Sequence, residues 1–301
     1  MPKIHATAII GEDVNIGENT SVGPYTTISD GVGIGENCSI DSCVRIYAGV
    51  RMGDHNQVLH GAVLGGAPQK LDFDPKTHSG VSIGHGNVFR EQCTVHRSMY
   101  EGRDTVIGND NFIMATGHIA HDCILKDGIV ICNGVLLAGH VTVGEKSFVS
   151  GNVVVHQFCN IGDYVMIGGG ARITQDCLHY SLVVGADAGR VVGTNSVGMR
   201  RAGFSPEDQE AIRQAFRTIF WSHLPLWEIK ARLREDANHH AQKLADFLES
   251  STRGICSARR RKPLNRDLPP GLYDSGDYPL TDIPEAGGSP PDRLSSLEQM
   301  F

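Results

Sequence analysis

The stretch HIAHDCILKDGIVICNGVLLAGH (118–140) combines a six-residue apolar period with clustered ionisable side chains. Ile119, Leu125, Ile131 and Leu137 recur every six residues, which fits neither the 3.6-residue period of an α-helix nor the two-residue period of a strand. A six-residue unit with one inward aliphatic suits a short strand followed by a sharp turn, and three such units make a coil of about 18 residues. The stretch therefore predicts a parallel β-helix.

The same period covers most of the chain. One series of aliphatic residues runs through 4–64, and a second series runs through 83–173. Two excursions, at 66–80 and 97–104, interrupt the rhythm. Because long loops on a rigid scaffold often carry binding residues, we expect the first excursion to bind a ligand. The short polar second excursion is interpreted as a passive surface insertion.

The period fails near Tyr180, and the composition then changes twice. We predict a β-helix over 1–190 and a helical domain over 191–256, because the intervening sequence acquires a helical apolar period. The segment 257–301 is rich in proline and poor in aliphatic residues, which predicts a disordered tail.

Helix starts are marked by capping residues. Ser205 is a good N-cap, and Pro206 suits the first helical position because its missing N–H is not needed there. Two further helices are expected to start near Pro225 and Asn238.

Bulk composition excludes several classes of protein. With 27 Lys and Arg against 34 Asp and Glu, the net charge of −7 gives no general reason to expect nucleic-acid or anionic membrane binding. No apolar run resembles a signal peptide or a membrane span, which predicts a cytoplasmic protein. Eight cysteines without a CxxC pair argue against a disulfide framework or a zinc ribbon.

An 18-residue coil places His121 directly below Gly139, since their numbers differ by 139 − 121 = 18. An imidazole can act as general base, and a glycine lets a substrate approach the backbone amide, which can donate to an oxyanion. The pair therefore predicts acyl transfer. Asp122 and His140 stack by the same arithmetic. Because strand neighbours point to opposite faces, Asp122 need not contact His121.

Two other interpretations of the histidines remain open. They could be solvent-facing turn residues, or they could hold zinc between subunits, as imidazoles do in the gamma-class carbonic anhydrases. Those enzymes space their paired histidines five residues apart, whereas His118 and His121 are three apart, and His96 does not complete the arrangement. We expect neither a metal nor an organic cofactor.

Several motifs together resemble one family. The chain is similar to the UDP-N-acetylglucosamine 3-O-acyltransferases, hexapeptide-repeat acyltransferases that act first in lipid A biosynthesis, over about residues 1–256. The motifs that carry the likeness are HIAHDC (118–123), LAGHV (137–141), VHQFC (155–159), IGGG (167–170), MRRAGFS (199–205) and STRG (251–254).

The resemblance implies a left-handed parallel β-helix followed by a C-terminal helical domain. It implies a homotrimer with active sites between subunits, which moves a 3-hydroxyacyl chain from acyl carrier protein to the 3-position of UDP-N-acetylglucosamine or a close UDP-amino sugar. His121 matches the family's general base and Gly139 its backbone oxyanion donor. The matching substrate-binding positions are Gln69, Lys70, Asp72, His118, Asp122, His140, His156, Gln157, Gly169, Asn195 and Arg201. Among these, Gly169 matches a hydrocarbon ruler, and Asn195 and Arg201 match nucleotide contacts.

The chain departs from the family pattern at substrate-recognition positions. Where the family usually reads Gln-Asp-Leu-Lys, this chain has its charges exchanged at Lys70 and Asp72. Positions 70 and 72 of an extended segment would face one side. Val197 replaces an acidic residue, and Ala202 replaces the second arginine of a pair. Our hypothesis is that acyl transfer is retained while the sugar nucleotide, or its binding mode, has drifted.

Alternatives within and outside this chemistry stay open at the level of sequence. The chain could be an N-acyltransferase on a 3-amino UDP-sugar, similar to the glucosamine N-acyltransferase of the same pathway, or a non-catalytic β-helix binding protein. For an acyl carrier protein, which is acidic, a basic docking surface is expected. Its candidate residues are Arg190, Arg200, Arg201 and Arg217.

Overall fold

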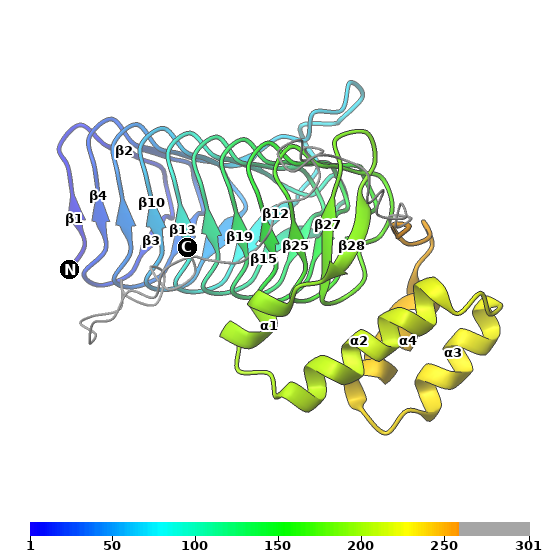
Figure 1. Ribbon diagram of the computed structural model, residues 1–301. Coiled ribbons are helices and arrows are strands. Elements are labelled where there is room, and N and C mark those ends of the chain that lie inside the picture. Colours follow the sequence, from blue (N-terminus) through cyan, green and yellow to red (C-terminus); the bar gives the residue numbers. More distant parts are fainter. Residues whose placement is uncertain (259–301) are drawn as a thin grey trace, which may run out of the picture. The chain divides into compact units, whose positions relative to one another are not determined.

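The computed structural model describes residues 1–258, so nearly all of the predicted tail at 257–301 lies outside the described residues. Short strands stack in parallel along one axis and form three sheets (Figure 1). The first sheet contains β1 (Lys3–Ile4), β4 (Ser21–Val22), β7 (Ser39–Ile40), β10 (Gln57–Val58), β13 (Val88–Phe89), β16 (Phe112–Ile113), β19 (Val130–Ile131), β22 (Phe148–Val149), β25 (Met166–Ile167), β27 (Ser181–Val184) and β28 (Arg190–Thr194). The second contains β2 (Ile9–Ile10), β5 (Thr27–Ile28), β8 (Arg45–Ile46), β11 (Val63–Gly66), β14 (Thr94–His96), β17 (His118–Ile119), β20 (Leu136–Leu137), β23 (Val154–Val155) and β26 (Arg172–Ile173). The third contains β3 (Asn15–Ile16), β6 (Gly33–Ile34), β9 (Val50–Met52), β12 (Gly80–Ile83), β15 (Asp104–Ile107), β18 (Ile124–Leu125), β21 (Thr142–Val143) and β24 (Asn160–Ile161).

The 18-residue register predicted from the period is confirmed. Ile119 pairs with Leu137, Leu137 with Val155, and Val155 with Ile173, each 18 residues further along the chain. These side chains point inward and are buried, so apolar surface removed from water holds successive coils together. The first coil is an exception, because Ile4 lies at the end of the stack of described coils and is 44% exposed.

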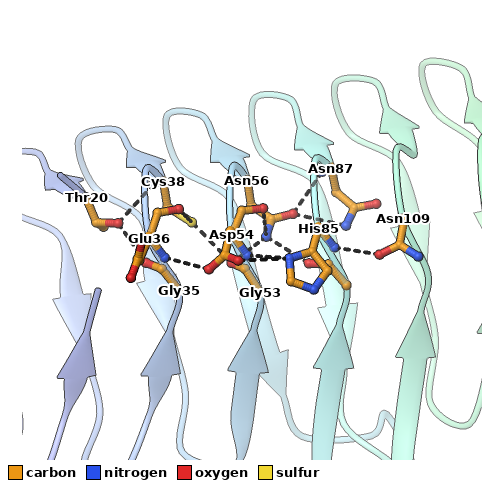
Figure 2. A network of polar contacts seen from close by, with 11 residues as sticks. Thr20, Gly35, Glu36, Cys38, Gly53, Asp54, Asn56, His85, Asn87 and Asn109 are labelled. Carbon is orange, nitrogen blue, oxygen red and sulfur yellow. Dashed lines mark hydrogen bonds and ion pairs between the residues drawn. The ribbon is translucent and has the colours of Figure 1, made fainter. Parts of the chain in front are cut away.

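Polar side chains bond the backbone at one corner, where the third sheet leads into the first (Figure 2). The Glu36 amide donates to Asp54 Oδ1 (2.8 Å) on the next coil, and the Asp54 amide donates to His85 Nδ1 (3.0 Å). The His85 amide donates in turn to Asn109 Oδ1 (2.9 Å). A side chain from each coil thus satisfies a turn amide of the coil before it, which would otherwise lack a partner.

The two excursions pack against each other at 66–80 and 97–104. The guanidinium of Arg97 lies over the Phe73 ring, 5.0 Å from its centroid, and donates to the carbonyl of Pro75 (3.0 Å). The second excursion therefore holds the first in place, as a cation–π contact and charge-assisted hydrogen bonds would do.

The helical part follows the last strand. Its members are α1 (Ser196–Arg201), α2 (Pro206–Trp221), α3 (Leu226–Glu235) and α4 (His239–Ser250). Strand β28 pairs antiparallel with β27 and reaches Thr194, so the helices start later than the boundary predicted at residue 191. The sequence did not predict α1. None of the helices in the described residues has the length and apolarity needed to cross a bilayer.

The predicted helix starts are confirmed by their caps. The Ser205 hydroxyl accepts the Asp208 amide (3.0 Å), with Pro206 at the first position of α2. Pro225 and Asn238 are the N-cap residues of α3 and α4, and the Asn238 side chain accepts the His240 amide (2.9 Å).

A buried carboxylate ties α4 to the last coils. Asp163 is 1% exposed and contacts the ammonium groups of Lys243 (2.6 Å) and Lys126 (3.4 Å). Burial raises the pKa of Asp163, but the Lys243 hydrogen bond and the neighbouring charges outweigh burial, and the net pKa is lowered. The Asp163 amide donates to His179 Nδ1 (2.7 Å), which requires this ring nitrogen to carry no proton.

Acid is expected to unfold the protein partly through His179. Burial lowers the pKa of His179 to about 4, whereas an unfolded histidine titrates near 6.5. The unfolded chain therefore binds this proton first, so stability falls as the pH drops from about 6.5 to about 4, by roughly 3 kcal/mol for this group. In His179→Gln, whose amide oxygen can still accept the Asp163 amide, the free energy of unfolding should depend less steeply on pH in this window. Denaturant titrations across this pH range measure the slope, with exposed His5→Gln as control; equal slopes for both variants would contradict the role of His179.

Candidate active site

The corner between the second and third sheets brings His121 and Gly139 together as predicted. A Cβ atom placed on Gly139 would lie 2.4 Å from Cε1 and 2.7 Å from Nε2 of the His121 ring. Real Cβ atoms do not come this close to other atoms, so the imidazole occupies the space that any side chain at position 139 would need. Gly139 is required here because it makes room for the ring edge that carries Nε2.

Asp122 fixes the orientation of His121. Its Oδ2 atom lies 2.8 Å from His121 Nδ1, and both side chains are largely buried. Because an ionised carboxylate only accepts hydrogen bonds, Nδ1 carries the proton in the neutral ring and Nε2 has the free lone pair. The two neighbours do touch, because strand alternation, which would have separated them, does not apply here. They occupy a turn, and Asp122 adopts a left-handed conformation (φ 61°) that directs both side chains to one side.

The second excursion reaches this carboxylate, so its interpretation as a passive surface insertion is wrong. The Ser98 hydroxyl donates to Asp122 Oδ1, and the Met99 amide donates to Oδ2 (3.2 Å). The Asp122 amide itself donates to the Thr105 hydroxyl (2.8 Å). Charge-assisted hydrogen bonds of this kind hold the carboxylate in one orientation.

The Gly139 amide has no hydrogen-bond acceptor among residues 1–258. At the equivalent turn position of the corner in Figure 2, a side chain from the next coil accepts such amides. Gln157 stands at that place above Gly139, but its side chain makes no such bond within the described residues. Since backbone N–H groups rarely stay unpaired, this amide is available to an acceptor brought by a substrate.

Aromatic rings surround the His121–Asp122 pair. His140 stacks on Phe158, with ring centroids 4.5 Å apart, and meets the His121 ring edge-on at 5.2 Å. Its Nε2 lies 4.0 Å from Asp122 Oδ2, beyond hydrogen-bond distance. Burial lowers the pKa of His140, against the opposing effect of Asp122. His140 therefore stays neutral at neutral pH, with its polar ring close to the base.

His118 lies on the outer side of β17, next to the same corner. Its Nδ1 is 2.7 Å from the Thr94 hydroxyl, and its ring meets His96 edge-on at 4.8 Å. Burial, followed by the proximity of His121, lowers the pKa of His118. Burial lowers the pKa of His96 to about 4, and its Nδ1 has no partner among the described residues. The neutral imidazoles of His118 and His96 therefore extend the site along the axis of the β-helix.

The next two coils carry further predicted residues. His156 and Gln157 are exposed one coil beyond Gly139, and the Phe158 amide donates to the Gly139 carbonyl (3.1 Å). A Cβ atom on Gly169 would meet only the Gly151 carbonyl at 3.4 Å and Ser150 at 4.0 Å. The surface above Gly169 is therefore open.

The predicted residues of the first excursion lie in a turn. The Phe73 amide donates to the Lys70 carbonyl (3.2 Å), so the segment is not extended as expected. Lys70 and Asp72 still face each other, with Nζ and Oδ1 at 3.1 Å, and the Lys70 hydrogen bond lowers the pKa of Asp72. Gln69 is exposed beside them. The exchanged charges thus neutralise each other on the surface.

Asn195 lies in the last coils. Its side chain caps α1 by accepting the Gly198 amide (3.0 Å), and its Nδ2 donates to the Tyr164 carbonyl (2.9 Å). Arg201 is exposed at the end of α1. Within one chain, the described contacts place Asn195 in a structural role and do not join it to His121.

The residues predicted for docking lie on different elements. Arg190 begins β28, and Arg200 stands beside Arg201 in the last turn of α1. Arg217 lies on α2 and contacts Glu210 (3.4 Å). Their use by a carrier protein stays a prediction.

One group of side chains could in principle hold a metal ion. His121, Asp122 and His140 each offer a ligand atom, and these atoms lie within 4.8 Å of one another. Tetrahedral zinc holds its ligands roughly 3.3 Å apart, so the group would have to contract. The Asp122 carboxylate is already occupied by hydrogen bonds. The arrangement suits proton transfer better, and the absence of a metal stays a prediction.

Sequence reasoning missed the contribution of Ser98, Met99 and Tyr100. The centroid of the Tyr100 ring lies 5.8 Å from that of His140, the ring that in turn meets His121. No periodic signal marks these residues, because they lie in a loop outside the repeat. The one available signal was position, since the excursion leaves the β-helix only one coil before His121.

Comparisons with known proteins agree with this architecture. Residues 176–256 match a family model described as UDP N-acetylglucosamine O-acyltransferase, domain 2. An acyl-[acyl-carrier-protein]–UDP-N-acetylglucosamine O-acyltransferase of Stenotrophomonas maltophilia is 44% identical over 257 residues, which cover 84% of this chain and 97% of the relative.

Solved structures give the same result. The UDP-N-acetylglucosamine acyltransferase of Francisella novicida has a TM-score of 0.82 at 32% identity, covering 84% of this chain and 94% of the other. The O-acyltransferase of Moraxella catarrhalis has a TM-score of 0.80 at 35% identity, covering 84% and 98%. These structures confirm the predicted left-handed parallel β-helix followed by a C-terminal helical domain.

Proposed function

The chain belongs to the UDP-N-acetylglucosamine O-acyltransferase family, and on that premise we propose that it transfers a 3-hydroxyacyl chain from acyl carrier protein to the 3-hydroxyl of UDP-N-acetylglucosamine. The observation that carries the proposal is the pairing of a hydrogen-bonded His121–Asp122 dyad with the Gly139 amide, which finds no acceptor within residues 1–258. Acyl transfer to a hydroxyl needs both a proton acceptor and a fixed donor for the developing negative oxygen.

In the proposed mechanism, Nε2 of His121 removes the proton of the sugar hydroxyl as its oxygen attacks the thioester carbonyl. Asp122 accepts the hydrogen bond from Nδ1, with Oδ2 2.8 Å from that nitrogen, and stabilises the imidazolium that forms. The Gly139 amide donates to the oxyanion of the tetrahedral intermediate. When this intermediate collapses, the C–S bond breaks, and the imidazolium returns the proton to the leaving thiolate.

A second subunit is proposed to complete the site, as expected for a homotrimer. Apolar side chains point outward from β18, β20 and β23 beside the corner that holds His121 and Gly139, which we call the catalytic corner. They are Ile124, Leu136 and Val154, whose exposed fractions are 46%, 47% and 38%. Exposed aliphatic residues next to polar chemistry are typical of surfaces that another chain or an apolar ligand covers. In the proposed trimer these residues line the boundary between subunits.

The acyl chain is proposed to pass over Gly169. The nearest atoms to a Cβ atom at this position are at ordinary van der Waals distance, so a larger side chain would project into open space. With glycine there, the wall leaves room for a longer hydrocarbon. The length of chain accepted by the enzyme is therefore expected to exceed what a bulky residue would allow.

The assay that tests this function uses purified acyl carrier protein thioesters of increasing 3-hydroxyacyl length. UDP-N-acetylglucosamine and its 3-amino analogue are offered as acceptors, and the acylated product is identified by mass spectrometry. We expect an ester of UDP-N-acetylglucosamine as the main product. Preferred acylation of the 3-amino analogue would replace the proposed acceptor, and failure with both acceptors would refute the activity.

A further inference from the structure

We propose that Ser98 is a positioning residue for acyl transfer, acting on the base through Asp122. The inference rests on the proposed roles of His121 and Asp122 and adds a member outside the β-helix to that pair. Ser98 belongs to the excursion at 97–104 and is fully buried.

The donor direction at Ser98 follows from its neighbours. The Tyr100 amide donates to the Ser98 oxygen (3.1 Å), so the hydroxyl hydrogen is free to be given elsewhere. The acceptor in reach is Asp122 Oδ1, and an ionised carboxylate has no hydrogen to offer in return. The Ser98 hydroxyl therefore donates a hydrogen bond to the Asp122 carboxylate and accepts none from it.

The two carboxylate oxygens of Asp122 accept hydrogen bonds from different partners. Oδ1 accepts from Ser98, while Oδ2 accepts from His121 Nδ1 (2.8 Å) and from the Met99 amide (3.2 Å). Rotation of the carboxylate would break the bonds on both sides at once. Ser98 thus keeps Oδ2 directed at Nδ1, and the imidazole keeps Nε2 directed at Gly139.

Ser98 is itself held by the first excursion. Its carbonyl accepts the Ser79 hydroxyl (2.5 Å), and its amide donates to the Gly80 carbonyl (3.2 Å). Ser79 also receives a hydrogen bond from Arg97, whose guanidinium holds the carbonyl of Pro75. A continuous set of contacts therefore connects the loop at 66–80 to the base.

The test compares Ser98→Ala with Ser79→Ala in steady-state transfer assays. Each substitution removes one hydroxyl from the same cluster, but only Ser98 touches Asp122. Ser98→Ala should lower kcat about 10-fold, the size expected for a hydrogen bond to a charged group, with KM for the nucleotide sugar changed less than about twofold. Ser79→Ala removes the hydrogen bond to the Ser98 carbonyl but leaves the Ser98 amide bonded to the Gly80 carbonyl, so it should lower kcat less than Ser98→Ala does.

A double-mutant cycle asks whether Ser98 works through the carboxylate. In an Asp122→Ala background, Ser98→Ala should lower kcat by less than about twofold, because the group it orients is gone. If Asp122→Ala does not fold, Asp122→Asn takes its place, and the loss caused by Ser98→Ala should shrink to about threefold or less. Ser98→Thr keeps the hydroxyl and should recover most of the kcat lost in Ser98→Ala.

Three results would overturn the role of Ser98. They are a kcat for Ser98→Ala within twofold of the unmodified enzyme, the same fractional loss in the Asp122→Ala background, and an equal kcat loss in Ser79→Ala. Failure of the proposed function itself would look different, since the unmodified enzyme would then form no ester. A dead His121→Ala enzyme beside an unimpaired Ser98→Ala enzyme refutes the positioning role alone.

Discussion

His121→Ala is expected to lower kcat for acyl transfer by about 10²-fold or more. The substitution removes the group that takes the proton of the acceptor hydroxyl, and general-base help of this kind contributes roughly 10²–10⁴ in rate. KM for the nucleotide sugar should change much less, because the ring acts on the reacting hydroxyl. Initial rates with acyl carrier protein thioester and UDP-N-acetylglucosamine measure both constants.

The protein should stay folded in this variant. Asp122 keeps its hydrogen bonds from Ser98 and the Met99 amide, so the carboxylate is not left without donors. The matched control is His5→Ala, which removes an exposed imidazole on the first coil and should leave kcat unchanged. Turnover of His121→Ala equal to that of the control would falsify the role of His121.

Gly139→Ala is expected to be nearly as damaging. The added methyl would lie 2.4 Å from Cε1 and 2.7 Å from Nε2 of His121, so either the ring or the backbone must move. Both movements separate the proton acceptor from the amide that donates to the oxyanion. Loss of one oxyanion donor alone costs about 10²–10³ in kcat, and a loss of at least this size is expected here.

Gly33→Ala is the matched control for Gly139→Ala. A Cβ atom at Gly33 has no neighbour within 4 Å, and Gly33 lies in β6, away from the catalytic corner. Thermal unfolding of both variants separates a local displacement from a loss of fold. If Gly139→Ala keeps more than about a tenth of the activity, the close approach of His121 to this backbone is not needed for transfer.

The six-residue period determined the β-helix and the placement of His121 against Gly139. Each inward aliphatic must meet the one on the next coil, so the spacing of Ile119, Leu137 and Val155 fixes a register of 18 residues. That register alone places His121 against Gly139, without knowledge of any contact. Capping by a side chain acts locally, which is why the starts of α2 and α4 could be predicted from Ser205 and Asn238. The start of α3 was marked by Pro225, whose fixed φ suits a helix start but whose side chain makes no cap hydrogen bond.

Only the tertiary structure decided what the insertions do. Thr94 pairs with His118, 24 residues on, because the second excursion is looped out of the register. How such a loop folds back depends on its own contacts, so the bond from Ser98 to Asp122 could not be read from the period. The left-handed backbone of Asp122, which turns its carboxylate toward His121, is likewise a property of the turn and not of strand alternation.

The attachment of the helices was also beyond the sequence. Asp163 and Lys243 are 80 residues apart, since 243 − 163 = 80, and their contact depends on how α4 packs on the last coils. The contacts between neighbouring coils can be predicted from the repeat, because every coil has the same geometry. Contacts made by loops and helices follow no such rule, and their partners are fixed only when the whole chain has folded.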